Sequence, residues 1–150
     1  MEICLRRAKS EDFERINELF SEMLQSIYQK QSVQGYQRED IDYYFRGGED
    51  WICVAEIHGK IEGFLSVEVH REPKAYIYYD DFCVSEKFRG RGVGTALMRR
   101  AEEYAQSIGV SAVILHVEES NLRARKFYES RGFTTLRRDG TRWCMVKHLE

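Results

Sequence analysis

One segment of the sequence combines glycines and arginines at the start of a helical pattern. Residues 82–100 read FCVSEKFRGRGVGTALMRR, a strand-like stretch, a glycine-rich turn and an amphipathic run. Alternating glycines remove Cβ atoms, so backbone N–H groups can converge at the helix N-terminus, which carries a partial positive charge. Such an end binds phosphate groups, and guanidinium groups add paired donors. The residues of this predicted anion site are Arg89, Gly90, Arg91, Gly92, Val93, Gly94 and Thr95.

Two other phosphate-binding patterns do not fit this turn. The P-loop pattern GxxxxGK[ST] is missing, and the glycine spacing is G-x-G-x-G rather than the dinucleotide fingerprint GxGxxG. The strands before the turn also form a meander rather than an opening βαβ unit. A glycine-rich strand-to-helix turn without any ligand remains the structural alternative.

Hydrophobic periodicity outlines the elements that position this turn. Alternating or continuous apolar runs predict strands at 2–8, 51–57, 61–69, 75–84, 111–117, 133–138 and 143–149. Apolar residues at three- and four-residue spacing predict helices at 10–29, with Ser10 as N-cap, and at 39–46, 92–108 and 121–130. The order β-α-α-β-β-β-α-β-α-β-β indicates one α/β domain over residues 1–150, with parallel strands on either side of the third helix. The run SAVILHV is typical of a strand that is buried on both faces.

Composition excludes several functional classes. The chain has 150 residues, is 43% apolar and carries a net charge of −2, which argues against a general nucleic-acid binder. It lacks a run long enough for a membrane span and a signal-peptide pattern, so we expect a cytoplasmic protein with no membrane partner. Residues 1–75 hold 10 Lys and Arg against 15 Asp and Glu, whereas residues 76–150 hold 13 against 10.

The cysteines and histidines do not form a metal motif. Cys4, Cys53, Cys83 and Cys144 are far apart in the sequence, and each lies in an apolar segment that predicts a buried, reduced thiol. The four histidines are also scattered, so we assign no metal. His116 lies within a strand, where a hydrogen-bonded structural histidine is the favoured interpretation and a general base is the alternative.

Three segments together resemble the GCN5-related N-acetyltransferase (GNAT) superfamily. R-G-R-G-V-G matches the family's pyrophosphate loop [RQ]-x-x-G-x-[GA], with Arg89, Gly92 and Gly94 at the pattern positions. N-L-R-A-R-K-F-Y-E-S-R-G-F (121–133) is similar to N-x-x-A-x-x-[FL]-Y-x-x-x-G-F, and Y-Y-D-D-F-C-V (78–84) is similar to the strand before the loop. The element order is also that of the family, which implies a mixed, mostly antiparallel sheet of about seven strands with about four helices.

The resemblance implies acetyl-coenzyme A as the acetyl donor. It places the donor in an opening between the strands that end near Val84 and Val117. Backbone groups of the segment Phe82, Cys83 and Val84 would pair with the pantetheine arm as an added strand does, and the glycine turn would bind the pyrophosphate. Asn121 would contact the pantetheine or order the facing loop, and a plain helix N-cap explains it equally well.

The implied chemistry is attack of an amine on a thioester. The amine must lose a proton, and the resemblance gives this role to Asp80; Asp81, another acid such as Glu118, or no dedicated base are alternatives. Neighbouring strand residues face opposite sides, so at most one of the two aspartates faces the cleft. A backbone N–H near residues 82–84 would stabilise the oxyanion. Tyr128 matches the family's general acid, although a half-buried aromatic residue is its structural alternative.

The resulting prediction is an acetyl-CoA-dependent N-acetyltransferase that uses direct attack in a ternary complex. A catalytically weak acetyl-CoA-binding sensor or regulatory domain is the alternative. The acceptor is a small-molecule or peptide amine such as a polyamine, an aminoglycoside or a protein amine. Residues 25–50, expected to shape the acceptor pocket, are acidic and aromatic. Several tyrosines, Tyr36 among them, are candidates to line it, although packing in the aromatic core is the favoured interpretation for most of them. A homodimer is left open, because dimers are frequent in this superfamily.

Overall fold

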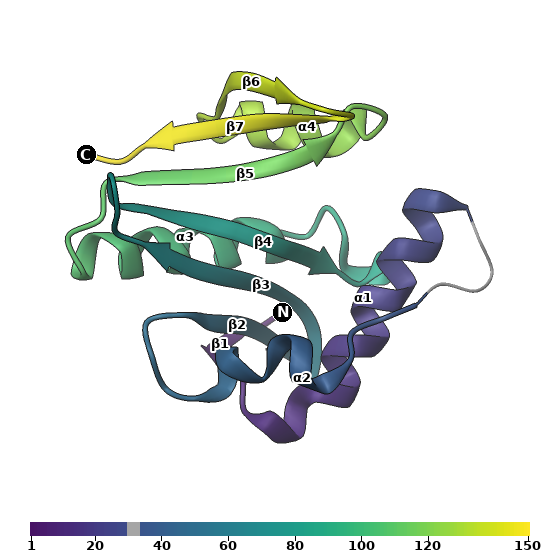
Figure 1. Cartoon of the computed structure of the whole chain (residues 1–150). Coiled ribbons are helices and arrows are strands. Elements are labelled where there is room, and N and C mark those ends of the chain that lie inside the picture. The colour runs from purple at the N-terminus through teal and green to yellow at the C-terminus, as the bar shows by residue number, and fades with distance from the viewer. Residues whose placement is uncertain (30–33) are drawn as a thin grey trace. The chain divides into compact units, whose positions relative to one another are not determined.

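The computed structural model, which describes residues 1–29 and 34–150, contains a seven-stranded sheet (Figure 1). The strands are β1 (Cys4–Arg7), β2 (Trp51–Ile57), β3 (Lys60–His70), β4 (Tyr76–Val84), β5 (Ala112–Glu118), β6 (Thr134–Asp139) and β7 (Arg142–His148). The helices are α1 (Phe13–Tyr28), α2 (Arg38–Ile41), α3 (Val93–Ser107) and α4 (Leu122–Ser130). The predicted element order and mixed α/β class are therefore confirmed. Part of the predicted polar break at 29–37, residues 30–33, lies outside the described residues.

The strands lie in the order β1-β2-β3-β4-β5-β7-β6. β1 with β2, β2 with β3, β5 with β7 and β6 with β7 are antiparallel, whereas β4 and β5 are parallel. The parallel pair on either side of α3 was predicted from the helical crossover. Within the described part of the chain, no helix is long and apolar enough to cross a bilayer.

Contacts divide the chain into two compact units. The first comprises Met1–Val67 and Asp81–Ala101, and the second comprises Glu68–Asp80 and Glu102–Glu150. β3, β4 and α3 each contribute residues to both units. The organisation of residues 1–150 as a single domain stays a prediction.

In the first unit, α1 buries its apolar face in a core with β2 and β3. Phe13, Ile16 and Leu19 on α1 are buried in one cluster with Ile52 and Phe64. Their three- and four-residue spacing places the helical residues on one stripe of the helix. In the β2–β3 turn, His58 and Gly59 have positive φ values of 53° and 76°, as a two-residue hairpin turn requires.

The start of α1 differs from the prediction. A 3-10 helix, Ser10–Asp12, precedes α1, so Ser10 is not the N-cap. The side chain of Asp12 instead accepts a hydrogen bond from the Lys9 backbone N–H at 2.7 Å. This turn therefore uses an aspartate three residues after Lys9 to satisfy a backbone donor.

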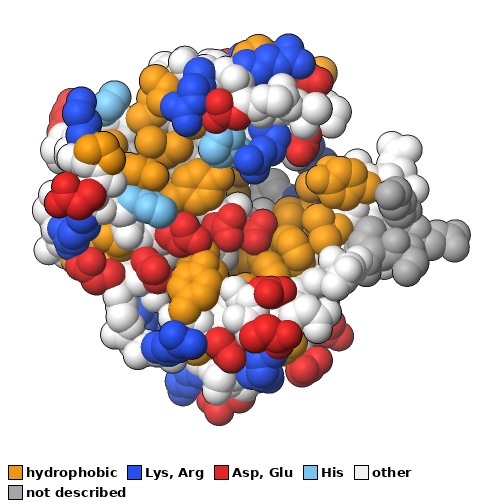
Figure 2. Space-filling view, in the orientation of Figure 1, with side chains coloured by type: hydrophobic (Ala, Val, Ile, Leu, Met, Phe, Trp, Pro, Cys, Tyr) orange, Lys and Arg blue, Asp and Glu red, His pale blue; other side chains and the backbone are white. Residues whose placement is uncertain are grey.

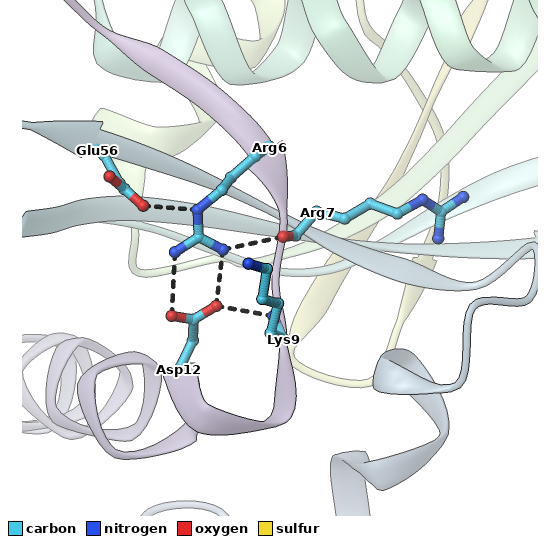
Figure 3. A network of polar contacts seen from close by, with 5 residues as sticks. All are labelled: Arg6, Arg7, Lys9, Asp12 and Glu56. Atoms are coloured by element: carbon cyan, nitrogen blue, oxygen red, sulfur yellow. Dashed lines mark hydrogen bonds and ion pairs between the residues drawn. The ribbon is translucent and has the colours of Figure 1, made fainter. Parts of the chain in front are cut away.

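An arginine joins this turn to the sheet edge (Figure 3). Arg6 on β1 donates to both carboxylate oxygens of Asp12, at 2.8 and 3.1 Å, and its Nε donates to Glu56 on β2 at 2.6 Å. The hydrogen bonds from Arg6 hold the pKa of Asp12 below its usual value. The Asp12 side chain is 12% exposed, so this pair is less screened than a surface ion pair.

In the second unit, β5 lies between β4 and β7. Val113, Leu115 and Val117 are buried, whereas the intervening residues are half-buried. The prediction that this strand is buried on both faces is therefore wrong, because an apolar run does not reveal whether helices cover both faces. The last two strands form the predicted hairpin, with an irregularity between Thr135 and Arg137.

We expect Asp12→Asn to lower the free energy of unfolding by about 1–2 kcal/mol near neutral pH, because it removes a charge-assisted, two-pronged contact. A carboxyl pKa that is lower in the folded state stabilises the fold above the unfolded value, about 3.9, and the stabilisation disappears as pH falls through the folded value. Urea unfolding should therefore show a difference from wild type that shrinks below about pH 4. Glu103→Gln, on the exposed side of α3, is the control. An equal difference at both pH values would contradict the assigned contact.

Candidate active site

The glycine turn lies at the N-terminus of α3. Gly90 and Gly92 have φ values of +75° and +88°, and α3 begins directly afterwards at Val93. Other residues rarely adopt this backbone conformation. The Gly92 carbonyl accepts from Ala96 N–H at 3.0 Å, which closes the first helical turn. The predicted loop therefore ends in a helix N-terminus, where backbone N–H groups point away from the helix.

The outer surface of this turn is open. Gly90 and Gly92 are both exposed, and a Cβ at either position would have no heavy atom within 4 Å. Gly94 belongs to the first turn of α3. Backbone geometry rather than crowding therefore explains the first two glycines, and the space beside them suits close approach by a ligand.

Several basic residues near the turn already have partners within the protein. Lys87 forms an ion pair with buried Glu62 at 3.4 Å. Arg89 Nε donates to the Val84 carbonyl at 3.3 Å, and Arg91 lies over the ring of Phe88. The guanidinium of Arg100 lies 5.5 Å from the Trp51 ring centre.

The two candidate aspartates have different surroundings. Asp80 is exposed and belongs to the second unit, whereas Asp81 is half-buried and belongs to the first. The Tyr36 hydroxyl donates a hydrogen bond to Asp81 Oδ2. The sequence placed Tyr36 among several tyrosines near the acceptor, and only the structure shows this contact.

Three of the four cysteines are buried as predicted, and Cys4 is exposed. Cys4 lies near the end of an edge strand, which explains why an apolar setting in the sequence does not bury it. Burial raises the pKa of Cys53 to about 12 and raises that of Cys83 as well. Cys83 Sγ contacts the Met23 sulfur at 3.3 Å, so the Cys83 side chain is packed inside the protein.

The second unit holds Asn121 and Tyr128. Asn121 is the N-cap of α4, and its side-chain oxygen accepts from Ala124 N–H at 3.2 Å. The capping role weighed from the sequence is therefore confirmed. Tyr128 is half-buried, and its ring lies edge-on to Phe133 with ring centres 5.7 Å apart.

His116 is the centre of a hydrogen-bonded chain in the same unit. Its Nδ1 lies 2.6 Å from the Tyr78 hydroxyl and its Nε2 lies 2.8 Å from Asp139 Oδ2. Burial raises the pKa of Tyr78 to about 12. A protonated phenol donates to Nδ1, so the neutral ring carries its proton on Nε2 and donates to Asp139. The interpretation of His116 as a hydrogen-bonded strand histidine agrees with this chain.

Cys144 lies beside this chain. His116, Asp139 and Cys144 each have one atom that could bind a metal, and these three atoms lie within 4.8 Å of one another. The side chain of Asp139 is paired with both His116 and Arg137. Burial also raises the pKa of Cys144, which favours the neutral thiol over the thiolate that binds metals. These pairings favour a hydrogen-bonded network of side chains over a cation-binding site.

The glycine turn and its surrounding fold agree with comparisons to known proteins. The acetyltransferase (GNAT) family matches residues 13–133. The chain belongs to this family. An uncharacterised N-acetyltransferase of Archaeoglobus fulgidus is 29% identical over 134 residues, covering 84% of this chain and 89% of that protein. The uncharacterised N-acetyltransferase YhfO of Bacillus subtilis is 30% identical over 136 residues, covering 86% and 88%.

This acetyltransferase also shares its fold with solved structures. The PaiA N-acetyltransferase of Thermoplasma acidophilum, solved in complex with coenzyme A, has a TM-score of 0.82 at 19% identity and covers 99% of both chains. Membership of the family and the named relatives make the protein an N-acetyltransferase.

We expect Gly92→Ala to weaken acetyl-CoA binding by about tenfold or more, because an alanine at positive φ is strained and the turn must change shape. Gly109→Ala is a matched control: Gly109 has a φ of +75° and no atom within 4 Å of a Cβ, and it lies beyond the end of α3. Both variants should lose about 1 kcal/mol of stability. Calorimetry should show weaker binding for Gly92→Ala alone. Equal acetyl-CoA affinity in the two variants would contradict the assigned site.

Proposed function

We propose that this N-acetyltransferase transfers the acetyl group of acetyl-CoA to a primary amine by direct attack in a ternary complex. The observation that carries this proposal is the exposed turn at the start of α3, in which Gly90 and Gly92 have positive φ values. Helix N-termini of this kind bind phosphate groups, and acetyl-CoA contains a pyrophosphate. The coenzyme A complex of the structurally similar PaiA enzyme supports the same donor.

The donor is proposed to contact two adjoining segments. Backbone N–H groups of the turn and of the first residues of α3 would bind the pyrophosphate, with Arg89 and Arg91 adding positive charge. The end of β4 would pair with the pantetheine arm through the backbone of Phe82 and Val84. Asn121 stays a proposed contact, since its side chain already caps α4.

The reaction needs three groups at the thioester. The amine nitrogen, once deprotonated, attacks the carbonyl carbon and forms the C–N bond. The C–S bond then breaks, and the nitrogen releases its second proton to solvent to give the amide. Asp80 or Asp81 is proposed to take up the ammonium proton, directly or through water. A backbone N–H near the end of β4 would stabilise the oxyanion. Tyr128 is proposed to donate its hydroxyl proton to the leaving thiolate and to be reprotonated from solvent.

The acceptor is proposed to be a cationic primary amine, in a small molecule or in a peptide. Support comes from the half-buried carboxylate of Asp81 in the first unit, where partial burial strengthens attraction to a cation. Figure 2 shows several acidic side chains close together near the middle of the displayed face, with basic side chains elsewhere on the same face.

The direct test is to incubate the purified protein with acetyl-CoA and a panel of amines. Spermidine, kanamycin, a peptide with a free N-terminal alanine and an Nα-blocked lysine amide represent the acceptor classes. Release of CoA thiol with at least one of them is expected, with acetyl-CoA binding seen by calorimetry. Absence of both binding and release would overturn the proposal. Binding without release would favour a CoA-binding regulatory domain.

We expect Tyr128→Phe to lower kcat by about 100-fold, because the thiolate would leave without a positioned proton donor. The dissociation constant for acetyl-CoA should stay within about twofold, since the ring and its contact with Phe133 remain. Tyr76→Phe, a half-buried tyrosine of the same unit that stacks on His70, is the control and should leave kcat near wild type. Unchanged kcat in Tyr128→Phe would remove Tyr128 from the mechanism.

A further inference from the structure

Tyr36 is held against α1 by a backbone hydrogen bond and a ring stack. Its backbone N–H donates to Asn17 Oδ1 at 2.7 Å, and its ring stacks on Phe20 with centres 3.9 Å apart and planes 7° from parallel. Gly35 lies so close to α1 that a Cβ there would be 2.3 Å from Asn17 Oδ1 and 2.7 Å from Ser21 Oγ. The phenol is therefore fixed in position before it meets any ligand.

This phenol donates a hydrogen bond to a carboxylate of β4. Its hydroxyl donates to Asp81 Oδ2, across 45 residues of sequence. A carboxylate accepts several hydrogen bonds through its two oxygens, so this bond orients the group without exhausting its capacity. The stack on Phe20 and the backbone hydrogen bond to Asn17 leave the Tyr36 ring little conformational freedom. This reduces the entropy cost of holding Asp81 in one orientation.

We propose that Tyr36 is a positioning residue that fixes the Asp81 carboxylate, and that Asp81, rather than Asp80, binds the ammonium group of the acceptor. This inference rests on the proposed acetyl transfer and identifies the acid on which acceptor affinity depends. Asp81 is half-buried, so its attraction to a cation is screened less than that of exposed Asp80. A carboxylate held in one orientation also fixes where the amine nitrogen lies, as attack on a thioester requires.

The test measures KM and kcat for wild type, Tyr36→Phe, Asp81→Asn, Asp80→Asn and the double variant Tyr36→Phe/Asp81→Asn. The acceptor is whichever of spermidine, kanamycin, the alanine peptide or the lysine amide the wild type acetylates fastest. Tyr36→Phe keeps the ring and removes one charge-assisted hydrogen bond, so the KM for the amine should rise about tenfold. The kcat and the KM for acetyl-CoA should stay within about threefold.

Asp81→Asn should raise the KM for the amine at least as much as Tyr36→Phe does. The double variant should have the same amine KM as Asp81→Asn, because Tyr36 acts through Asp81. Asp80→Asn should change the amine KM by less than about threefold. Tyr104→Phe is the matched control, since Tyr104 lies on α3, outside the residues expected to shape the acceptor pocket. Gly35→Ala, which displaces the Asn17 amide that holds the Tyr36 backbone and keeps both functional groups, is a second variant and should raise the KM for the amine in the same way.

An unchanged amine KM in Tyr36→Phe, or a larger effect of Asp80→Asn than of Asp81→Asn, would overturn the inference and leave acetyl transfer intact. Failure of the proposed function is a different result, since the wild type would then acetylate no amine of the panel, whether or not it binds acetyl-CoA, and the inference would fall with it. Failure of the inference alone leaves an active wild type whose amine KM does not respond to the Tyr36 and Asp81 substitutions.

Discussion

The close approach of three backbone segments at Gly63 is the constraint on which the glycine turn depends. A Cβ at this position of β3 would lie 3.1 Å from the Cys83 carbonyl oxygen, 3.1 Å from Val93 Cγ1 and 3.3 Å from Leu97 Cδ1. A side chain here would force the end of β4 and the first turns of α3 away from β3 by a few tenths of an ångström, so the glycine allows this close packing. That packing determines where the N-terminus of α3 lies relative to the strand that precedes the turn.

Ion pairs of the buried Glu62 side chain fix the same region. Glu62, the neighbour of Gly63, is 2% exposed and pairs with Arg15 of α1 at 2.9 Å and with Lys87 at 3.4 Å. The Glu62 carbonyl also accepts from Ser85 N–H at 2.8 Å. Because Glu62 is buried, removing both cations would leave its charge uncompensated, which is strongly destabilising. The segment that leads into the glycine turn is thus tied both to β3 and to α1.

Sequence patterns predicted the elements well because strand and helix periodicity are local. The bounds of β2 were predicted without error, and the glycine turn was predicted at the start of α3, where the structure places it. The contacts of Tyr36 with Asp81 and of His116 with Tyr78 and Asp139 were not predicted. They join residues 45, 38 and 23 positions apart, and they depend on strand register and on how a loop packs against α1, which no local pattern encodes. The capping of α4 by Asn121 was recognisable because a cap is local.

We expect the backbone of the glycine turn to bind the pyrophosphate of acetyl-CoA. Amide NMR of the isotope-labelled protein during titration with acetyl-CoA measures this contact residue by residue. The amide signals of Gly92, Val93 and Gly94 should shift in proportion to the bound fraction, whereas those of Gly109 and Gly140, which also have positive φ, should stay in place. Saturable binding that leaves the turn amides unmoved would show that the pyrophosphate binds elsewhere.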